Sequence, residues 1–279
     1  MKGRFITVLI VIVLSCQSAL AASDQISIAS FNIQILGKTK ANKQDVLHDI
    51  VKIMKNYDVI AVQEIRDKTS EAVTKLKDAL NADGEEYKYV IGPRVGRSSS
   101  KEQYAVFYKS KKIEYISNYT YEDQDDVFQR EPLIVQLKAR NAKFRFALAV
   151  IHTEPDHATE EIIALDEVVK DAQVKLGEKD IIVLGDYNAD CNYYNEDSSN
   201  AFTASNYTWL ITNDLDTNVA DTSCTYDRIV LTGSVKEDYA NKSGVYKYEN
   251  DLGLNRSQVK AISDHYPVYS YFYTNKDTD

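Results

Sequence analysis

The 279-residue sequence has few glycines and prolines, with 10 and 4 of them, and no low-complexity tract. Fibrous and low-complexity chains are therefore excluded. No self-similar period of the solenoid type recurs along the chain. Hydrophobic residues make up 44% and charged residues 27% of the sequence, which is an ordinary globular composition with enough apolar residues for a sizeable core.

Cysteine is also scarce, with 3 residues in the chain. Neither Cys191 nor Cys224 has a second thiol or a histidine at ligand spacing, so no zinc site is predicted. If Cys16 is removed with an export signal or carries a lipid, the other two remain as a pair in an oxidising compartment. We therefore predict a disulfide between Cys191 and Cys224, which would close a loop of about 33 residues and stabilise the fold by ~3–4 kcal/mol in the chain-entropy model.

No apolar run reaches the ~20 residues that are needed to span a membrane, so stable membrane insertion is not predicted. The run over residues 5–14 follows Lys2 and Arg4 and precedes Ala19-Leu20-Ala21, which is the order of a signal peptide with its cleavage pattern. We predict a signal peptide over residues 1–22 and a secreted or periplasmic protein. Lipid anchoring through Cys16 is the alternative, because residues 13–16 loosely resemble a bacterial lipoprotein cleavage box.

Basic residues are outnumbered by acidic ones, 33 to 42, which gives a formal net charge of −9. A passive nucleic-acid binder should instead be basic. An enzyme remains compatible with this charge, because a carboxylate-rich site that binds metal cations can approach a phosphate with its local charge inverted.

Strand-like and helix-like segments alternate along the chain. Strands are expected at residues 26–31, 58–63, 104–108, 133–137, 144–151, 181–184, 228–231 and 267–273, several of them apolar on both faces. Helical periodicity is present at residues 43–57, 70–80 and 159–176. Because no linker separates blocks of elements, we predict one α/β-type domain over residues 23–279 rather than two domains.

Four of the expected strands end in a side chain that can ligate a metal or transfer a proton, namely Asn32, Glu64, His152 and Asp186, and Asn188 follows the last of them. Taken singly, such a residue is more commonly a turn former or a solvated charge. If the strands share a direction and a sheet system, their ends converge on one edge, where rigid strands hold functional groups accessible. The sequence therefore predicts a site at this edge.

The chain has only 4 histidines. His48 lies on the polar face of the first expected helix, and His157 lies in an expected loop. His152 and His265 are left as the two histidines in motif-like settings.

The blocks around these residues resemble, in order, the motif series of the deoxyribonuclease I family. They are Ser30-Phe31-Asn32, Gln63-Glu64-Ile65-Arg66-Asp67, Lys101-Glu102-Gln103-Tyr104, Arg130-Glu131-Pro132, Ile151-His152, Gly185-Asp186-Tyr187-Asn188-Ala189-Asp190-Cys191, Tyr226-Asp227-Arg228-Ile229-Val230 and Ile262-Ser263-Asp264-His265-Tyr266-Pro267. The resemblance implies an α/β (α+β) fold, a four-layer sandwich of two mostly antiparallel β-sheets packed face to face with helices on both outer sides.

The same resemblance implies a divalent-cation site. Glu64 is the expected principal ligand of Mg²⁺ or Mn²⁺, with Asn32, Asp186 and Asp264 as further ligands. Asn188 is expected to orient the phosphate or the attacking water. Hard cations of this kind suit oxygen ligands.

Two histidine–carboxylate pairs are implied as the acid and the base. His265 with Asp227 would activate water, and His152 with Glu102 would protonate the leaving 3′-oxygen, which gives a 5′-phosphate and a 3′-hydroxyl. A carboxylate on one imidazole nitrogen fixes the tautomer and favours the charged form. The reverse assignment of the two histidines stays open.

Contacts with DNA are implied for four side chains, namely Arg66, Arg97, Arg130 and Tyr226. Because arginine in a narrow minor groove reads shape more than sequence, we expect double-stranded DNA to be cleaved with weak sequence preference. Ser100 departs from the family, which usually has a tyrosine there that stacks on a sugar. That difference is expected to weaken duplex binding or to alter the substrate preference.

Two acidic loops resemble the structural calcium sites of the family. One contains Asp126, and the other contains Asp216, Asn218 and Thr222; plain acidic loops are the alternative interpretation. The segment at residues 89–93 does not match the actin-binding segment of the family, so actin binding is not predicted, and a monomer is expected.

Two other functions compete with a DNA endonuclease. One is another phosphoesterase of the same superfamily, such as a sphingomyelinase-type lipid phosphodiesterase or a ribonuclease. The other is a non-catalytic binding module. The last is disfavoured because the residues that a decayed enzyme would lose are all present, namely Glu64, His152, Asp186, Asp227 and His265.

Overall fold

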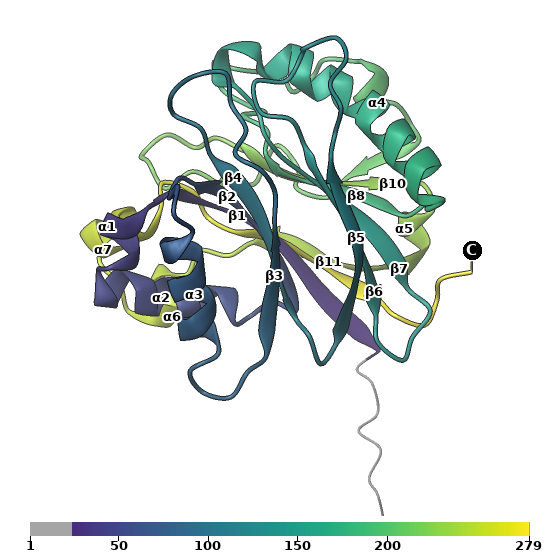
Figure 1. Cartoon of the computed structure of the whole chain (residues 1–279). Helices are drawn as coiled ribbons and strands as arrows, with labels where there is room; N and C mark the ends of the chain where they lie inside the picture. The colour runs from purple at the N-terminus through teal and green to yellow at the C-terminus, as the bar shows by residue number, and fades with distance from the viewer. Residues whose placement is uncertain (1–23, 279) are drawn as a thin grey trace, which may run out of the picture.

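Two six-stranded β-sheets pack face to face, with helices on both outer faces, in the computed structural model of the chain (Figure 1). The structure describes residues 24–278. The predicted signal peptide, Cys16 and residues 23 and 279 lie outside the described residues. The predicted four-layer sandwich is confirmed. None of the helices in residues 24–278 combines the length and the hydrophobicity of a membrane-spanning segment.

Each sheet contains one parallel pair of strands among antiparallel ones, within the described residues. The first sheet has the order β11 (Tyr239–Val245), β12 (Val268–Tyr273), β1 (Gln25–Leu36), β2 (Val59–Ile65), β4 (Gln103–Lys109) and β3 (Tyr87–Ile91). The second has the order β5 (Ile113–Thr120), β6 (Leu133–Ala139), β7 (Arg145–His152), β8 (Ile181–Asp186), β10 (Asp227–Thr232) and β9 (Tyr207–Trp209). The parallel pairs are β1 with β2 and β7 with β8.

The helices divide between the two outer faces (Figure 1). The first sheet is covered by α1 (Lys38–Ala41), α2 (Gln44–Met54), α3 (Glu71–Leu80), α6 (Glu249–Leu252) and α7 (Arg256–Ile262), and the second by α4 (Ala158–Leu176). The shorter elements are η1 (Pro155–His157), η2 (Ala201–Thr203) and α5 (Val235–Asp238). The three predicted helices correspond to α2, α3 and α4, and Gly177 ends α4 in the left-handed conformation, with φ of 58°.

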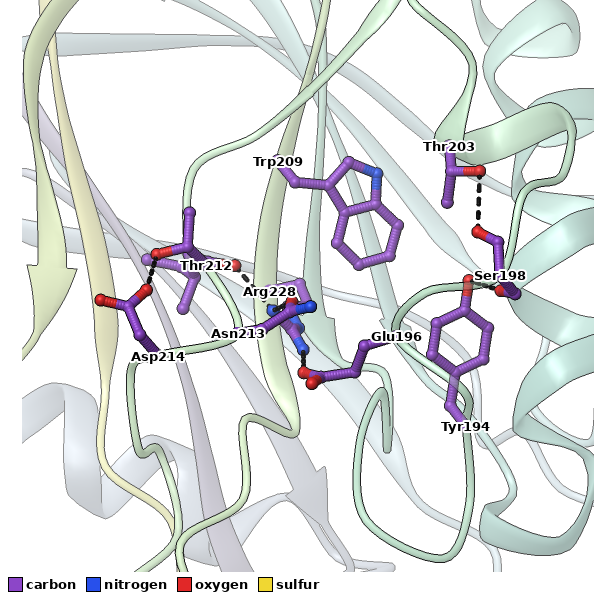
Figure 2. Close-up of a pocket in the computed structure, with 10 residues that line it drawn as sticks. Tyr194, Glu196, Ser198, Thr203, Trp209, Thr212, Asn213, Asp214 and Arg228 are labelled. Atoms are coloured by element: carbon purple, nitrogen blue, oxygen red, sulfur yellow. Dashed lines mark hydrogen bonds and ion pairs between the residues drawn. The ribbon is translucent and has the colours of Figure 1, made fainter.

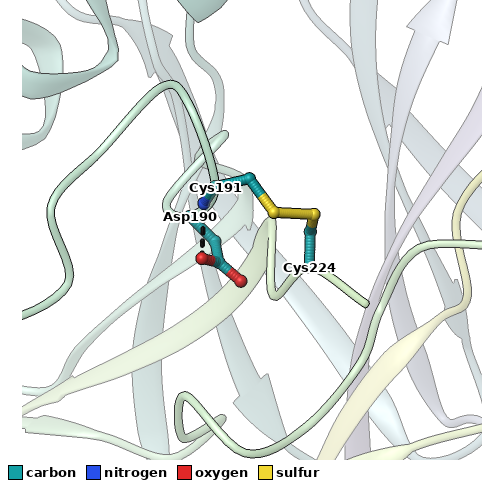
Figure 3. A group of neighbouring side chains, drawn as sticks. All are labelled: Asp190, Cys191 and Cys224. Carbon is teal, nitrogen blue, oxygen red and sulfur yellow. Dashed lines mark hydrogen bonds between the residues drawn. A yellow bond between two sulfur atoms is a disulfide. The ribbon is translucent and has the colours of Figure 1, made fainter. Parts of the chain in front are cut away.

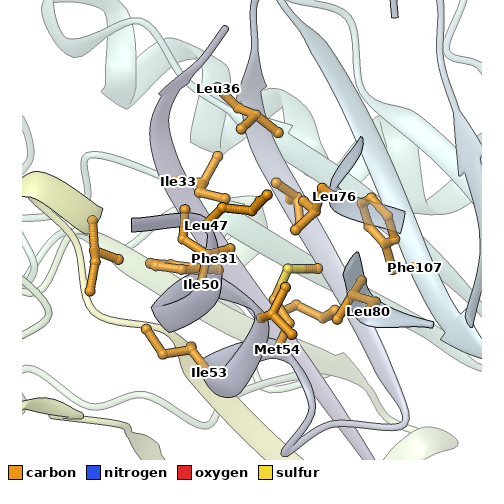
Figure 4. Packing of buried hydrophobic residues seen from close by; sticks show 14 of the residues in the cluster. Phe31, Ile33, Leu36, Leu47, Ile50, Ile53, Met54, Leu76, Leu80 and Phe107 are labelled. Carbon is orange, nitrogen blue, oxygen red and sulfur yellow. The ribbon is translucent and has the colours of Figure 1, made fainter. Parts of the chain in front are cut away.

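Three apolar layers hold the sandwich together. One lies between the first sheet and its helices, where Phe31 and Phe107 meet Ile50, Met54 and Leu76 (Figure 4). The second lies between the two sheets, and the third lies under α4. Alternate residues of an interior strand enter different layers, so both faces are buried and the sequence of the strand is continuously apolar. Burial on both faces holds the strand ends rigidly, and the candidate site is built on these ends.

Four strands were not foreseen from the sequence, namely β3, β5, β9 and β11. They are the two edge strands of each sheet. The eight expected strands are the eight interior strands of the two sheets within residues 24–278.

Candidate active site

The ends of the two parallel strand pairs meet across the sandwich. Asn32 and Glu64 lie at the ends of β1 and β2, and His152 and Asp186 are register partners at the ends of β7 and β8. Nδ2 of Asn32 donates to Oδ2 of Asp186 at 3.0 Å and lies 3.3 Å from Oε1 of Glu64. One buried amide therefore joins carboxylates from both sheets. The predicted convergence of the four strand ends is confirmed.

A glycine allows the second parallel pair to approach so closely. Gly185 precedes Asp186 on β8 and has φ of 155°. A Cβ atom at this position would lie 1.9 Å from the carbonyl oxygen of Ile151, which directly precedes His152. No side chain fits there, so glycine is required for the spacing between His152 and Asp186.

Both predicted histidine–carboxylate pairs are formed. Nδ1 of His152 lies 2.7 Å from Oε1 of Glu102, and Nδ1 of His265 lies 2.8 Å from Oδ2 of Asp227. Each Nδ1 hydrogen therefore points at a carboxylate, which leaves Nε2 as the nitrogen that can exchange a proton with a substrate. The two Nε2 atoms lie 3.5 and 3.4 Å from the same atom, Oδ2 of Asp186. Both imidazoles thus face one point.

The charges of this cluster shift the pKa values of its members. Burial acts to lower the pKa of His152, but the charges of Glu102 and Asp186 outweigh it and raise this pKa above its usual value. Burial also acts to lower the pKa of His265, and Asp227 and Asp186 raise it well above 6.5. Burial acts to raise the pKa of Asp186, but the two imidazoles lower it, so this carboxylate stays ionised between them.

Asp227 differs from the other carboxylates of the site. It is fully buried, and burial raises its pKa despite the opposing effect of His265. Oδ2 of Asp227 forms the hydrogen bond with His265. The backbone N–H of Asp227 donates to the hydroxyl of Thr217 at 3.1 Å. Asp227 therefore orients the imidazole of His265, as the resemblance to the family implies.

The donor set around Asp186 suits a hard cation. Asp186, Asp227 and His265 offer ligand atoms that all lie within 4.8 Å of one another. Glu64 adds a further carboxylate, which the Nδ2 group of Asn32 joins to Asp186. Oxygen ligands held this closely fit Mg²⁺ or Mn²⁺ better than soft metals.

Two further predicted residues flank this cluster. Asn188 has φ of 48°, its backbone N–H donates to Oδ1 of Asp186 at 3.0 Å, and its Nδ2 donates to the carbonyl of Thr153 at 3.1 Å. Asp264 is exposed at the edge of the site, with Oδ1 at 3.8 Å from Nε2 of His265. Asp264 therefore lies where a ligand or substrate could reach it, whereas Asn188 is buried, at 6% exposed.

The four predicted DNA contacts occupy different environments. Arg66 lies over the site, with NH2 at 3.3 Å from Glu64 and 3.6 Å from Glu102, and NH1 donates to Ser100 at 2.9 Å. Tyr226 stands beside the catalytic candidate His265, with ring centroids 6.0 Å apart.

Of the other two predicted DNA contacts, Arg130 is buried and Arg97 forms an ion pair within the protein. Arg130 is only 9% exposed and donates to the backbone carbonyls of His152 and Thr153 at 2.8 and 2.7 Å. It also contacts Glu102 at 3.3 Å, so in this structure it supports His152 from within. Arg97 is exposed, and it forms an ion pair of 2.9 Å with Asp126.

The acidic residues of the two loops that were predicted to bind calcium form hydrogen bonds or ion pairs within the protein. In one, Nδ2 of Asn218 donates to Thr222, and Oδ1 of Asp216 accepts from the backbone N–H of Asn218 at 3.1 Å. Lys247 lies 3.2 Å from the other oxygen of Asp216. Asp126 belongs to the other loop and pairs with Arg97. The calcium assignment stays a prediction.

The predicted disulfide between Cys191 and Cys224 is present (Figure 3). It ties the loop after β8 to the segment before β10, and Asp190 beside it accepts from the backbone N–H of Thr225 at 2.6 Å. Asp190, Cys191 and Cys224 lie close together, but the two cysteines form a disulfide, so these three residues are not a metal site. The bridge instead fixes the loop that carries Asn188 next to the strand that carries Asp227.

A separate cavity of about 540 Å³ lies behind β10 (Figure 2). Its lining includes Trp209, Tyr194 and the buried ion pair between Arg228 and Glu196. Because side chains alternate along a strand, Arg228 faces the α4 side of the second sheet, whereas Asp227 faces the histidines. The cavity is therefore on the other face of the sheet from the candidate active site.

Sequence reasoning missed a bulge in β1 directly after Asn32. Gln34 and Ile35 both have left-handed backbone conformations, with φ of 47° and 53°. Their backbone N–H groups donate to the side chains of Asn32 and Glu64, and the ammonium of Lys40 donates to the backbone carbonyl of Ile33. A left-handed isoleucine has no recognisable sequence signal, because β-branched residues avoid this conformation.

Comparisons with known proteins identify the family of this chain and agree with its fold. Residues 29–265 match the Endonuclease/Exonuclease/phosphatase family. The deoxyribonuclease-1 of Bos taurus is 36% identical over 255 residues, which cover 87% of this chain and 90% of the relative. The deoxyribonuclease-1 of Homo sapiens is 37% identical over 270 residues, which cover 91% of this chain and 95% of the relative.

A solved structure supports the fold alone. The endonuclease/exonuclease/phosphatase family protein from Bacteroides thetaiotaomicron superposes with a TM-score of 0.62 at 17% identity, covering 90% of this chain and 98% of that one. Taken together, the chain belongs to the Endonuclease/Exonuclease/phosphatase family and, within it, to the deoxyribonuclease I family.

Proposed function

We propose that this protein is a divalent-cation-dependent endonuclease that hydrolyses phosphodiester bonds in DNA. The observation that carries the proposal is that the Nε2 atoms of His152 and His265 face the same oxygen of Asp186. Hydrolysis of a phosphodiester requires a base for water, an acid for the leaving oxygen and positive charge near the phosphate. The relatives named deoxyribonuclease-1 support DNA as the substrate.

Glu64 would hold the cation, together with Asn32, Asp186 and Asp264, and Asn188 would orient the phosphate or the water. Mg²⁺ or Mn²⁺ bound there would supply positive charge at the non-bridging oxygens of the phosphate. The carboxylates of Glu64 and Asp186 already lie on either side of the Asn32 amide.

The two imidazoles would move the protons. In this mechanism Nε2 of His265 takes a proton from water, and Nε2 of His152 gives a proton to the leaving 3′-oxygen, so that a 5′-phosphate and a 3′-hydroxyl result. Asp227 and Glu102 hold the tautomers that leave each Nε2 facing the substrate. Because both Nε2 atoms lie at similar distances from Asp186, the reverse assignment has the same geometric support.

The DNA would lie across the exposed rim of this site. Arg66, Arg97 and Tyr226 are the proposed contacts, and Arg130 would act mainly by holding His152 and Thr153. A duplex read by arginine in the minor groove is cleaved with weak sequence preference. We further propose a monomer that is exported through its signal peptide, with Ca²⁺ in a structural role; the disulfide suits an oxidising compartment.

A substrate panel tests this proposal. The purified protein is incubated with supercoiled plasmid, single-stranded DNA, RNA and sphingomyelin, each with Mg²⁺ plus Ca²⁺ and each with EDTA. We expect EDTA-sensitive nicking of the plasmid, with products that a ligase can reseal because they carry 5′-phosphate and 3′-hydroxyl ends. Lipid turnover without nicking would instead identify a lipid phosphodiesterase, and cleavage of RNA alone would identify a ribonuclease.

A further inference from the structure

The bulge in β1 contributes a donor to each of three proposed cation ligands. The backbone N–H of Gln34 donates to Oδ1 of Asn32 at 3.0 Å, and its side-chain Nε2 donates to Oδ2 of Asp264 at 2.8 Å. The backbone N–H of Ile35 donates to Oε2 of Glu64 at 3.0 Å. Two consecutive residues thus orient ligands that come from three different segments of the chain.

This bulge is held in a backbone conformation that its residues disfavour. Gln34 and Ile35 are both left-handed, and Ile35 is β-branched and half exposed, at 50%. Such conformations cost about 1–3 kcal/mol each and persist only where the surroundings hold them. Half of the surface of Ile35 faces solvent, so apolar packing of this side chain alone does not account for the conformation. Some other group must therefore hold the backbone of the bulge.

Lys40 is that group. Its ammonium donates to the carbonyls of Ile33 and Ile262, each at 2.9 Å, and to the carbonyl of Gln34. Ile33 and Gln34 directly follow Asn32, and Ile262 ends α7, just before the segment with Asp264 and His265. A second contact supports the same junction, because the hydroxyl of Ser263 donates to the carbonyl of Asn32 at 2.6 Å.

We propose that Lys40 is a positioning residue, which clamps the β1 bulge to the end of α7 so that Gln34 and Ile35 orient Asn32, Glu64 and Asp264 for cation binding. This inference rests on the proposed function, since these three side chains are the proposed ligands. The three bonds of Lys40 exhaust the donors of one ammonium, which suits a fixed clamp rather than a mobile surface charge.

Electrostatics alone predicts the opposite effect of removing Lys40. Burial lowers the pKa of Lys40 to about 8, against the opposing charges of Asp264 and Glu64. These carboxylates are thus close enough to sense its charge, and deleting a nearby positive charge should strengthen the binding of a cation. If Lys40 acts by position, its loss should weaken binding instead. The sign of the change therefore separates the two effects.

The test compares Lys40→Met with Lys40→Arg, which keeps a charge and several donors. Lys38→Met is the matched control, because Lys38 lies on the same short helix and forms only an exposed ion pair with Glu71. Binding of Mn²⁺ is measured by titration calorimetry, and thermal stability is recorded for every variant. We expect Lys40→Met to bind Mn²⁺ at least about tenfold more weakly, the usual range for a residue that orients metal ligands. Lys40→Arg should recover part of this loss, and Lys38→Met should match the wild type.

A second measurement needs neither a cation nor catalysis. Amide hydrogen exchange in the metal-free protein should be faster at Gln34 and Ile35 in Lys40→Met, because their N–H bonds to Asn32 and Glu64 open more often. Unchanged exchange at these amides, or Mn²⁺ binding equal to or tighter than that of the wild type, would overturn the inference. A protein that binds Mn²⁺ but cleaves no phosphodiester would overturn the proposed function and leave the clamp intact.

Discussion

Asn32 of the first sheet donates a hydrogen bond of 3.0 Å from its side chain to Asp186 of the second sheet. The two residues are 154 positions apart in the chain, and both are buried. The same amide nitrogen lies 3.3 Å from Glu64, so it separates two carboxylates that would otherwise repel each other. In the proposed enzyme, a bound cation would neutralise the charges of these two carboxylates.

Asn32→Asp should make the protein depend on that cation for stability. The substitution replaces a buried donor with a third carboxylate beside Glu64 and Asp186, so in EDTA we expect the free energy of unfolding to fall by about 1–3 kcal/mol. Mg²⁺ should restore more stability to this variant than to the wild type, since binding to the folded state stabilises it. Thermal unfolding with EDTA and with Mg²⁺ measures both effects. The exposed Asn192→Asp is the control, and an unchanged melting temperature in EDTA would contradict the prediction.

His152→Ala and His265→Ala should each lower kcat for plasmid nicking by at least ~10²-fold, the usual scale of acid–base catalysis. Each imidazole is held by a carboxylate on Nδ1 and faces Asp186 with Nε2, so neither can replace the other. His48→Ala, on the exposed face of α2, should keep wild-type activity. Near-normal turnover in either active-site variant would rule out the two-histidine mechanism.

The stability of the metal-free protein should fall as pH rises above the ordinary histidine range. The pKa of His265 is raised well above 6.5 in the folded state, so its contribution is fully present below about 6.5, the pKa expected in the unfolded chain. That contribution is lost as pH rises through the folded-state pKa. Thermal unfolding in EDTA across this range should show the decline, and His265→Gln should flatten it. A slope that is identical in His265→Gln would show that another group is responsible.

Gly185→Ala should disturb both the fold and the site. Its Cβ would lie 1.9 Å from the carbonyl oxygen of Ile151, so β7 and β8 must separate at the point where His152 and Asp186 face each other. We expect a loss of about 3 kcal/mol or more in the free energy of unfolding. Gly233→Ala is the matched control just after β10, where the new Cβ meets only the carbonyl oxygen of Asn206, at 3.8 Å. Equal melting temperatures for the two variants would contradict this prediction.

The predicted strands divide cleanly by their place in the sheets. The interior strands were all recognisable. Most of them are buried on both faces, which demands a continuous apolar run such as residues 181–184, whereas β12 alternates between buried and partly buried residues. The edge strands were not. β5 is largely exposed after Ile113, and β11 is exposed or only partly buried throughout. An edge strand depends on backbone pairing with one neighbour, which leaves little pattern in its side chains.

In the candidate site, the reactive side chains were predictable from the sequence, whereas the groups that position them were not. The side chains that do the proposed chemistry stand at strand ends or in recognisable motifs, so their identities and partners were predictable. The groups that position them were not predictable, as Lys40 shows: its partners are backbone carbonyls, which every residue carries. Arg130 was predicted as a DNA contact, and the structure shows that it is mostly engaged with the backbone of His152 and Thr153.

The sequence by itself determined the interior strands, the three longer helices, the cysteine pair and the order of the reactive side chains. These features follow from local rules, since burial requires apolar residues, and carboxylates and imidazoles are side chains that can bind a cation and transfer protons. Only the tertiary structure decided that Asn32 meets Asp186, that both imidazoles face one oxygen, and that Lys40 closes the β1 bulge. Those relationships join segments that are far apart in the chain, and their geometry depends on how two twisted sheets pack, which no local pattern records.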